Sequence, residues 1–200
     1  HPVGEKTDGH VDMCGGCHSR RAIIDDLDSR ATYHDQYQIA LLDEGLYYPD
    51  GQIQDEVYVL GSFLQSKMHA KGVTCMNCHN PHTGKLVLQG NNLCAQCHLS
   101  AEYDTARHHF HPSDSKGAQC VECHMPETNY MLVDERRDHK FGIPNPAVSE
   151  KLGSPNACNG CHKGTTAAWA GSALDEWLKA PLKPDAYSGI VAAARLGDPV

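Results

Sequence analysis

The chain repeats one five-residue pattern, Cys-x-x-Cys-His, as Cys14-Gly-Gly-Cys17-His18, Cys75-Met-Asn-Cys78-His79, Cys94-Ala-Gln-Cys97-His98, Cys120-Val-Glu-Cys123-His124 and Cys158-Asn-Gly-Cys161-His162. We number these motifs 1 to 5 in chain order. Together they use all ten cysteines of the 200-residue chain. Because histidine contributes only 14 residues, its presence after all five cysteine pairs has a chance probability on the order of one in a million.

The spacing within each motif fits covalent attachment of haem. Two thiols about one helical turn apart can each form a thioether with a haem vinyl group, and the imidazole of the next residue then reaches the iron. Cysteine pairs of this spacing also occur in zinc ribbons, redox disulfides and disulfide frameworks, but none of these requires histidine at the next position. The motifs therefore predict five haem c groups, and paired motifs holding zinc are the main alternative.

The histidines of the motifs supply one axial ligand to each iron, and we call them proximal. They are His18, His79, His98, His124 and His162. Nine other histidines remain for the opposite, distal position, which is more than bis-histidine ligation of five irons requires. We predict as distal ligands His34, His69, His82, His111 and His139, with His10, His108 and His109 in reserve.

The composition leaves little material for a core made of protein. Apolar residues are 40% of the chain, a figure that includes the cysteines, and there are only three Phe and two Trp. With about one haem per 40 residues, the porphyrins must supply most of the buried apolar surface. We therefore predict a mainly α-helical multihaem cytochrome c with much irregular structure, short helices, little β structure and a haem-dominated core.

We divide the chain into a pentahaem module, residues 1–164, and a C-terminal helical segment, residues 165–200. In that segment Trp169 and Trp177 belong to one apolar helical stripe, and a second helix is predicted over 185–196. The segment either covers the last haem or begins a helical repeat array.

Residues 19–74 contain no motif, so ordinary protein structure must form there. Pro49-Asp50-Gly51 predicts a turn, and the residues after it fit either a helix over 55–68 or a short hairpin. Ser154-Pro155 is interpreted as the N-cap and first residue of the motif 5 helix.

Two pairs of arginines can interact with haem propionates, because a guanidinium group matches a carboxylate. They are Arg20-Arg21 and Arg136-Arg137. The simpler interpretation of the charged run at 134–138 is an exposed loop.

Net charge and cysteine chemistry bound the partners and the compartment. A formal net charge of −8 argues against nucleic acid and favours a basic protein or a mineral surface. Covalent haem attachment indicates the periplasm or the exterior of a prokaryote. No apolar run is long enough to form a transmembrane segment, and the absence of a leader before His1 is interpreted as processing or shortening of a longer precursor.

Several stretches outside the motifs resemble a family of bacterial multihaem cytochromes related to octahaem and hydroxylamine-oxidoreductase-like cytochromes. They are Ala40–Tyr48, Asp50–Ile53, Gly61–Met68, His108–His111, Arg136–His139 and Ser154–Cys158. The resemblance implies a cytochrome module followed by tetratricopeptide-like repeats. Family members usually carry further motifs upstream and longer repeats, so a distal histidine here could serve a haem outside this chain. The chain also resembles in kind the small subunits of extracellular cytochrome filaments.

The function predicted from these features is electron transfer along five closely spaced, low-spin haems, without substrate chemistry. Its partners would be redox proteins, extracellular acceptors or further copies of the chain in a nanowire filament. The alternative is a reductase of small nitrogen or sulfur compounds, which needs one open iron site. The spare histidines favour the electron carrier over the enzyme.

If the haems form the core, the haem-free chain should be largely unfolded. We expect its far-ultraviolet circular dichroism to lack the native helical signal that the haem-loaded protein gives. A native-like spectrum from haem-free protein would contradict the prediction.

Overall fold

The computed structural model describes residues 8–26, 28, 31–179, 182 and 186–198. In this part of the chain the longer helices are α1 (Asp8–His18), α9 (Ala167–Leu178) and α10 (Ala186–Leu196). The shorter ones are α2 (Tyr33–Gln36), α3 (Leu60–Leu64), α4 (Ser100–Tyr103), α5 (Ala106–His109), α6 (Cys120–His124), α7 (Pro146–Leu152) and α8 (Ala157–Cys161). Tight 3-10 turns are η1 (His69–Lys71), η2 (Cys75–Asn77), η3 (Gly90–Gln96) and η4 (Lys116–Ala118).

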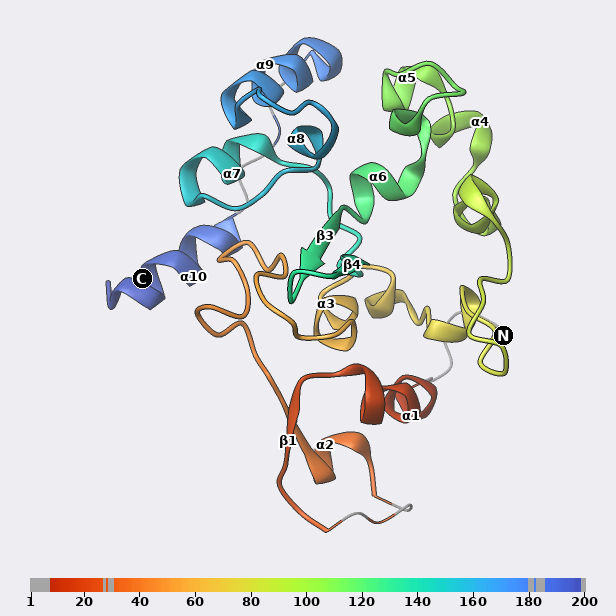
Figure 1. Ribbon diagram of the computed structural model, residues 1–200, viewed down its shortest axis with the longest axis vertical. Helices are drawn as coiled ribbons and strands as arrows, with labels where there is room; N and C mark the ends of the chain where they lie inside the picture. The colour runs from red at the N-terminus through yellow and green to blue at the C-terminus, as the bar shows by residue number, and fades with distance from the viewer. Residues whose placement is uncertain (1–7, 27, 29–30, 180–181, 183–185, 199–200) are drawn as a thin grey trace.

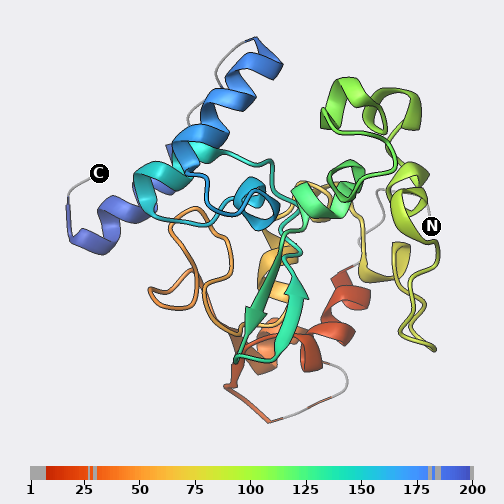
Figure 2. The same cartoon turned by 45° about the horizontal axis from the view of Figure 1, so that its top comes forward.

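The β structure consists of two small antiparallel pairs. Strand β1 (Arg21–Ile23) pairs with β2 (Tyr37–Ile39), and β3 (Glu127–Tyr130) pairs with β4 (Asp134–Arg137). The β3–β4 hairpin lies centrally, with α1 and α2 on one side and α5, α8 and α9 on the other (Figures 1 and 2). The predicted fold class, mainly helical and irregular with little β structure, is confirmed.

The protein part of the core is two separate clusters. The first consists of Val11, Tyr33, Leu60 and Phe63. The second consists of Tyr47, Ile53, Val57 and Tyr130. Neither resembles the single continuous interior of an ordinary domain of this length.

The turn at Pro49-Asp50-Gly51 is confirmed, because Gly51 donates its N–H to the carbonyl of Tyr48 at 2.9 Å and has a φ of 81°. The helix predicted over 55–68 is shorter, covering only Leu60–Leu64. The C-terminal helix predicted over 185–196 is confirmed over Ala186–Leu196, and Asp185 lies outside the described residues.

Two local predictions were wrong. The N-cap of α8 is Asn156, whose side chain accepts the N–H of Asn159, while Ser154 instead donates to Asp50 at 2.6 Å. Residues 134–137 form strand β4 instead of an exposed loop, because Arg136 and Arg137 bind protein carboxylates that lie far from them in the sequence. A run of charges carried no information about those partners.

The packing of α1 against the first cluster depends on a glycine inside motif 1. A Cβ atom on Gly15 would lie 2.9 Å from Leu60 and 3.0 Å from the Tyr33 ring, whereas one on Gly16 would meet nothing within 4 Å.

We expect Gly15→Ala to destabilise the haem-loaded protein by about 1–3 kcal/mol through overpacking. Gly16→Ala should be neutral or stabilising by up to about 1 kcal/mol, because alanine is the better helix former. Chemical denaturation of the two variants measures the contrast, and equal stabilities would refute this account of the packing.

Candidate haem-binding sites

Each motif lies on or beside a short helical element, and this places its two thiols and its imidazole on one turn. Motif 1 ends α1, motifs 2 and 3 coincide with η2 and η3, and motifs 4 and 5 occupy α6 and α8. Capping side chains begin two of these turns: Asn77 accepts the N–H of Thr74 at 2.8 Å ahead of motif 2, and Asn156 caps motif 5. The local fold of the motifs therefore follows from the sequence.

The first three motifs touch one another in chain order. Helix α1 contacts η2. Burial raises the pKa of Cys75, and the Cys14 thiol is near enough to raise it further. The side chain of Gln96 in motif 3 donates to the carbonyl of Asn77 in motif 2 at 3.4 Å.

The same order continues to motif 5. Asn91, at the start of η3, accepts the N–H of Cys120 and donates to the carbonyl of Ala118, both at 3.0 Å. Helix α6 also contacts η3, so motifs 3 and 4 are in contact. Helix α6 contacts α8, and both line one open cavity of about 170 Å³. The five attachment peptides thus form a continuous series from motif 1 to motif 5.

Three proximal histidines face a histidine from elsewhere in the chain. The ring centres of His79 and His139 are 6.4 Å apart and their planes differ by 26°. His124 faces His108 at 6.1 Å and 16°. His162 faces His111 at 6.1 Å and 42°.

These separations match the span of one metal ion. A metal–imidazole bond is about 2 Å long and the ring centre lies about 1.1 Å behind the bonding nitrogen, so two imidazoles on opposite sides of one iron have centres about 6.2 Å apart. The three pairs therefore fit the two axial positions of a haem iron.

Hydrogen bonds also set the protonation of one ring in each pair. Nδ1 of His124 donates to the carbonyl of Gly142 at 2.9 Å, Nδ1 of His139 donates to that of Arg137 at 2.9 Å, and Nδ1 of His111 donates to that of His109. A carbonyl only accepts, so the proton is on Nδ1 and the lone pair of the neutral ring is on Nε2. Nε2 is then free to bind a metal.

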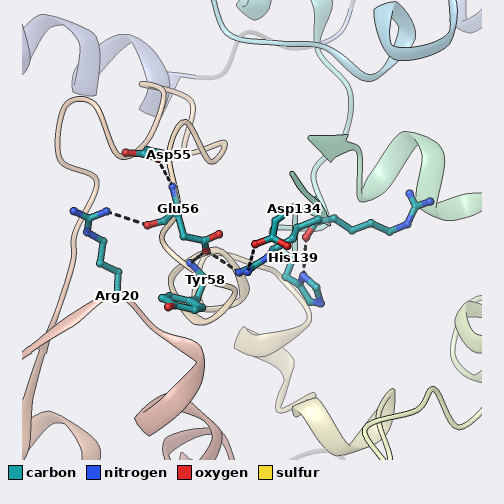
Figure 3. A network of polar contacts seen from close by, with 8 residues as sticks. Arg20, Asp55, Glu56, Tyr58, Asp134 and His139 are labelled. Atoms are coloured by element: carbon teal, nitrogen blue, oxygen red, sulfur yellow. Dashed lines mark hydrogen bonds and ion pairs between the residues drawn. The ribbon is translucent and has the colours of Figure 1, made fainter. Parts of the chain in front are cut away.

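His139 is held in place by contacts that extend into the first half of the chain. It follows β4 directly, and the edge of Phe141 packs against its ring at 6.0 Å. In β4, Arg136 binds Glu56 at 2.9 Å, and Glu56 also accepts the N–H of Tyr58 (Figure 3).

The other arginine of β4 connects His139 to motif 4, since Arg137 binds Glu122 of α6 at 2.8 Å. Burial lowers the pKa of His139 below its ordinary value, which favours the neutral ring that a metal requires. Arg136 and Arg137 are therefore already bound to protein carboxylates, and a haem propionate would have to compete with these carboxylates for the two guanidinium groups.

The segment His108–His111 presents two imidazoles to two neighbouring motifs. Phe110 ends α5 with a φ of 56°, a left-handed conformation that turns the chain between His108 and His111. Its ring stacks on Trp177 of α9 at 4.7 Å and 9°. Helix α9 also places Trp169 against the proximal His162, 4.9 Å between ring centres. This C-terminal helix therefore forms a wall of the cavity between motifs 4 and 5.

The remaining candidates have other surroundings. Among the described residues, the ring nearest to the proximal His98 is that of Tyr103, at 5.7 Å, and no imidazole faces His18 at the separation of the three pairs. His34 packs on Tyr33, His69 packs on Phe63, and His82 is exposed. The prediction from the sequence placed His108 behind His82 and His34, because the sequence does not show which loop packs against which motif.

The exposed surface of the chain also fits large apolar groups between its segments. The protein exposes 12933 Å², whereas a compact protein of 21.9 kDa exposes about 9300 Å². Apolar side chains are exposed beside motifs 2 and 3, at Leu86, Val87, Leu88, Leu99 and Tyr103. Covalent haem would cover such surface.

The thiols themselves do not have the arrangement of a zinc site. All ten cysteines are described and none is in a disulfide. Within the described residues, no three side chains of His, Cys, Asp or Glu are gathered as a metal site requires.

Comparisons with known proteins concern the motifs and the fold. Residues 68–102, which contain motifs 2 and 3, match the family model of the doubled CXXCH motif. The fold is similar to the crystal structure of the outer cell wall cytochrome OcwA, with a TM-score of 0.62 and 18% identity. The similarity covers 84% of this chain but 51% of OcwA, so the chain corresponds to about half of that protein. No curated protein sequence matches it at a significant level.

The match to the doubled CXXCH motif indicates covalently bound haem c, and the fold is similar to that of a cytochrome. Over the part of the chain that the structure describes, no helix has the length and apolar character needed to cross a bilayer.

Proposed function

We propose that this chain is an electron-transfer protein that carries five haem c groups, one on each motif. When bound, haem supplies a one-electron iron centre whose potential depends on its axial ligands and surroundings. The observation that carries the proposal is the set of three imidazole pairs, 6.1–6.4 Å apart, because an iron with two imidazole ligands has no position left for a substrate.

We infer three distal ligands from these pairs. His139 serves motif 2, His108 serves motif 4 and His111 serves motif 5. The distal ligands of motifs 1 and 3 come from the remaining candidates, His10, His34, His69 and His82.

We infer the order of the haems along the electron path from the contacts between attachment peptides. Because each motif touches the next in chain order, the path runs from motif 1 through motifs 2, 3 and 4 to motif 5. Motifs 1 and 5 are its two ends, and they are the positions at which external donors and acceptors exchange electrons.

Three finer features belong to the same proposal. The similarity to an outer cell wall cytochrome supports a location outside the cytoplasm, at or beyond the cell surface. Helices α9 and α10 fit either a cover for the last haem or the start of a tetratricopeptide-like array. A homopolymeric filament would join the motif 5 end of one copy to the motif 1 end of the next.

A reductase with one open iron is the second candidate, and one observation favours it. The proximal His98 of motif 3 is faced by the phenol ring of Tyr103, 5.7 Å away, instead of by an imidazole. A phenol is an acid–base group of the kind that reduction of nitrite or hydroxylamine needs.

The intact mass of the purified protein should exceed that of the chain by five haems, and its spectra should be low-spin throughout. The dithionite-reduced protein should be reoxidised in one fast phase by a soluble ferric complex, measured by stopped flow. Changing both cysteines of motif 1 to serine should remove one haem mass and slow that reaction.

Sustained turnover of nitrite or hydroxylamine with an artificial donor, together with a high-spin signal, would replace this proposal with the reductase. Electron microscopy of the same material tests the filament, which discrete particles alone would exclude.

The position of His111 depends on a glycine. A Cβ atom on Gly117 would lie 2.6 Å from Cγ of the His111 ring, whereas one on Gly160, inside motif 5, would meet nothing within 4 Å. We expect Gly117→Ala to displace the His111 ring and convert part of one haem to high spin. His111→Ala should convert that haem completely, and Gly160→Ala should leave it low-spin. Electron paramagnetic resonance of the oxidised protein measures all three, and an unchanged low-spin spectrum of His111→Ala would disprove the assignment.

A further inference from the structure

His109 lies between the two histidines of its segment that face motifs 4 and 5, and it lines the same cavity as His124 and His162. Its Nδ1 accepts the backbone N–H of His111 at 3.2 Å. A backbone amide can only donate, so Nδ1 holds the lone pair and the proton of the neutral ring is on Nε2. His109 therefore has the opposite tautomer to His111, His124 and His139.

This tautomer argues against a role for His109 as an iron ligand. A ligating histidine normally donates a proton from its other nitrogen to an acceptor, as His139 does to the carbonyl of Arg137. In His109 that other nitrogen is already an acceptor. Its Nε2–H remains a hydrogen-bond donor.

Among the described residues, the buried Nε2–H of His109 has no hydrogen-bond partner. Buried donors in native proteins are almost always paired. Of the described residues that line the cavity, the one carboxylate is that of Glu122, and it is bound by Arg137 at 2.8 Å and by Lys116 at 3.2 Å. A carboxylate of the group that fills the cavity is the acceptor that this arrangement leaves for His109.

We propose that His109 is a positioning residue that donates its Nε2–H to a propionate carboxylate of a haem attached at motif 4 or motif 5. The inference rests on the proposed function, because it requires haem at these motifs. The hydrogen bond fixes the propionate and withdraws part of its negative charge. Negative charge near the iron favours the ferric state, so this bond raises the midpoint potential of that haem.

The test compares His109→Ala with His109→Gln in the haem-loaded protein. Glutamine carries an amide N–H close to the position of the imidazole Nε2–H, so it retains the donor, whereas alanine removes it. Three measurements are made on each variant: electron paramagnetic resonance, a redox titration of the haems, and resonance Raman spectra of the propionate bending modes.

We expect His109→Ala to keep every haem low-spin, to shift one midpoint potential to a more negative value and to shift one propionate mode. His109→Gln should remain close to the wild type in all three. A high-spin haem in His109→Ala would overturn the proposal in favour of an iron ligand, and unchanged potentials and Raman modes would overturn it in favour of no contact.

The proposed function fails separately. It fails if the wild-type protein lacks haem at motifs 4 and 5 or does not give up electrons to a ferric complex. A wild-type protein that passes both tests, with a His109→Ala variant that is indistinguishable from it, defeats only the role of His109.

Discussion

In the proposed function, the spacing of two imidazoles around one iron is the constraint on which the rest of this structure depends. It requires that histidines from separate segments be held just over 6 Å apart, with Nε2 free on each ring. The protein meets it with backbone carbonyls, which bind Nδ1 of His111, His124 and His139. Backbone acceptors are fixed by the local fold, so they orient the rings without a large core.

The secondary structure serves mainly to bring these segments together. The β3–β4 hairpin delivers His139 to motif 2, and its arginines bind Glu56 from the first half of the chain and Glu122 from motif 4. These ion pairs are partly buried and connect elements far apart in sequence, so losing one partner would leave a charge uncompensated beside a haem site. In the segment His108–His111, the left-handed Phe110 has a similar role, because its stacking on Trp177 offsets the cost of that backbone conformation.

The sequence predicted what depends on local chemistry and missed what depends on tertiary contacts. Motif spacing gave the attachment sites, and the sparse apolar content gave the fold class. The tryptophan stripe gave helix α9. No local sequence pattern indicated which histidines would be distal ligands. His108 faces His124 because residues 105–111 fold back on α6, which is a tertiary contact. The ion pairs of β4 were also missed. The charged run at 134–138 is equally compatible with a solvated loop and with a hairpin, and the sequence does not show that Arg136 binds Glu56, 80 residues away.

The distribution of the protein core explains why the motifs are in contact in chain order. Among the described residues, six of the ten buried hydrophobic side chains lie in residues 19–74, the longest segment without a motif: Tyr33, Tyr47, Ile53, Val57, Leu60 and Phe63. From Cys75 to His124 the connections between motifs are shorter, residues 80–93 and 99–119, and short connections place consecutive elements side by side. Between motifs 1 and 2 a long segment could have separated the two sites, but it folds into its own clusters and packs α1 against η2. The protein core therefore forms in the segment that has no haem motif. By packing α1 against η2, this core adds motif 1 to the series of attachment peptides.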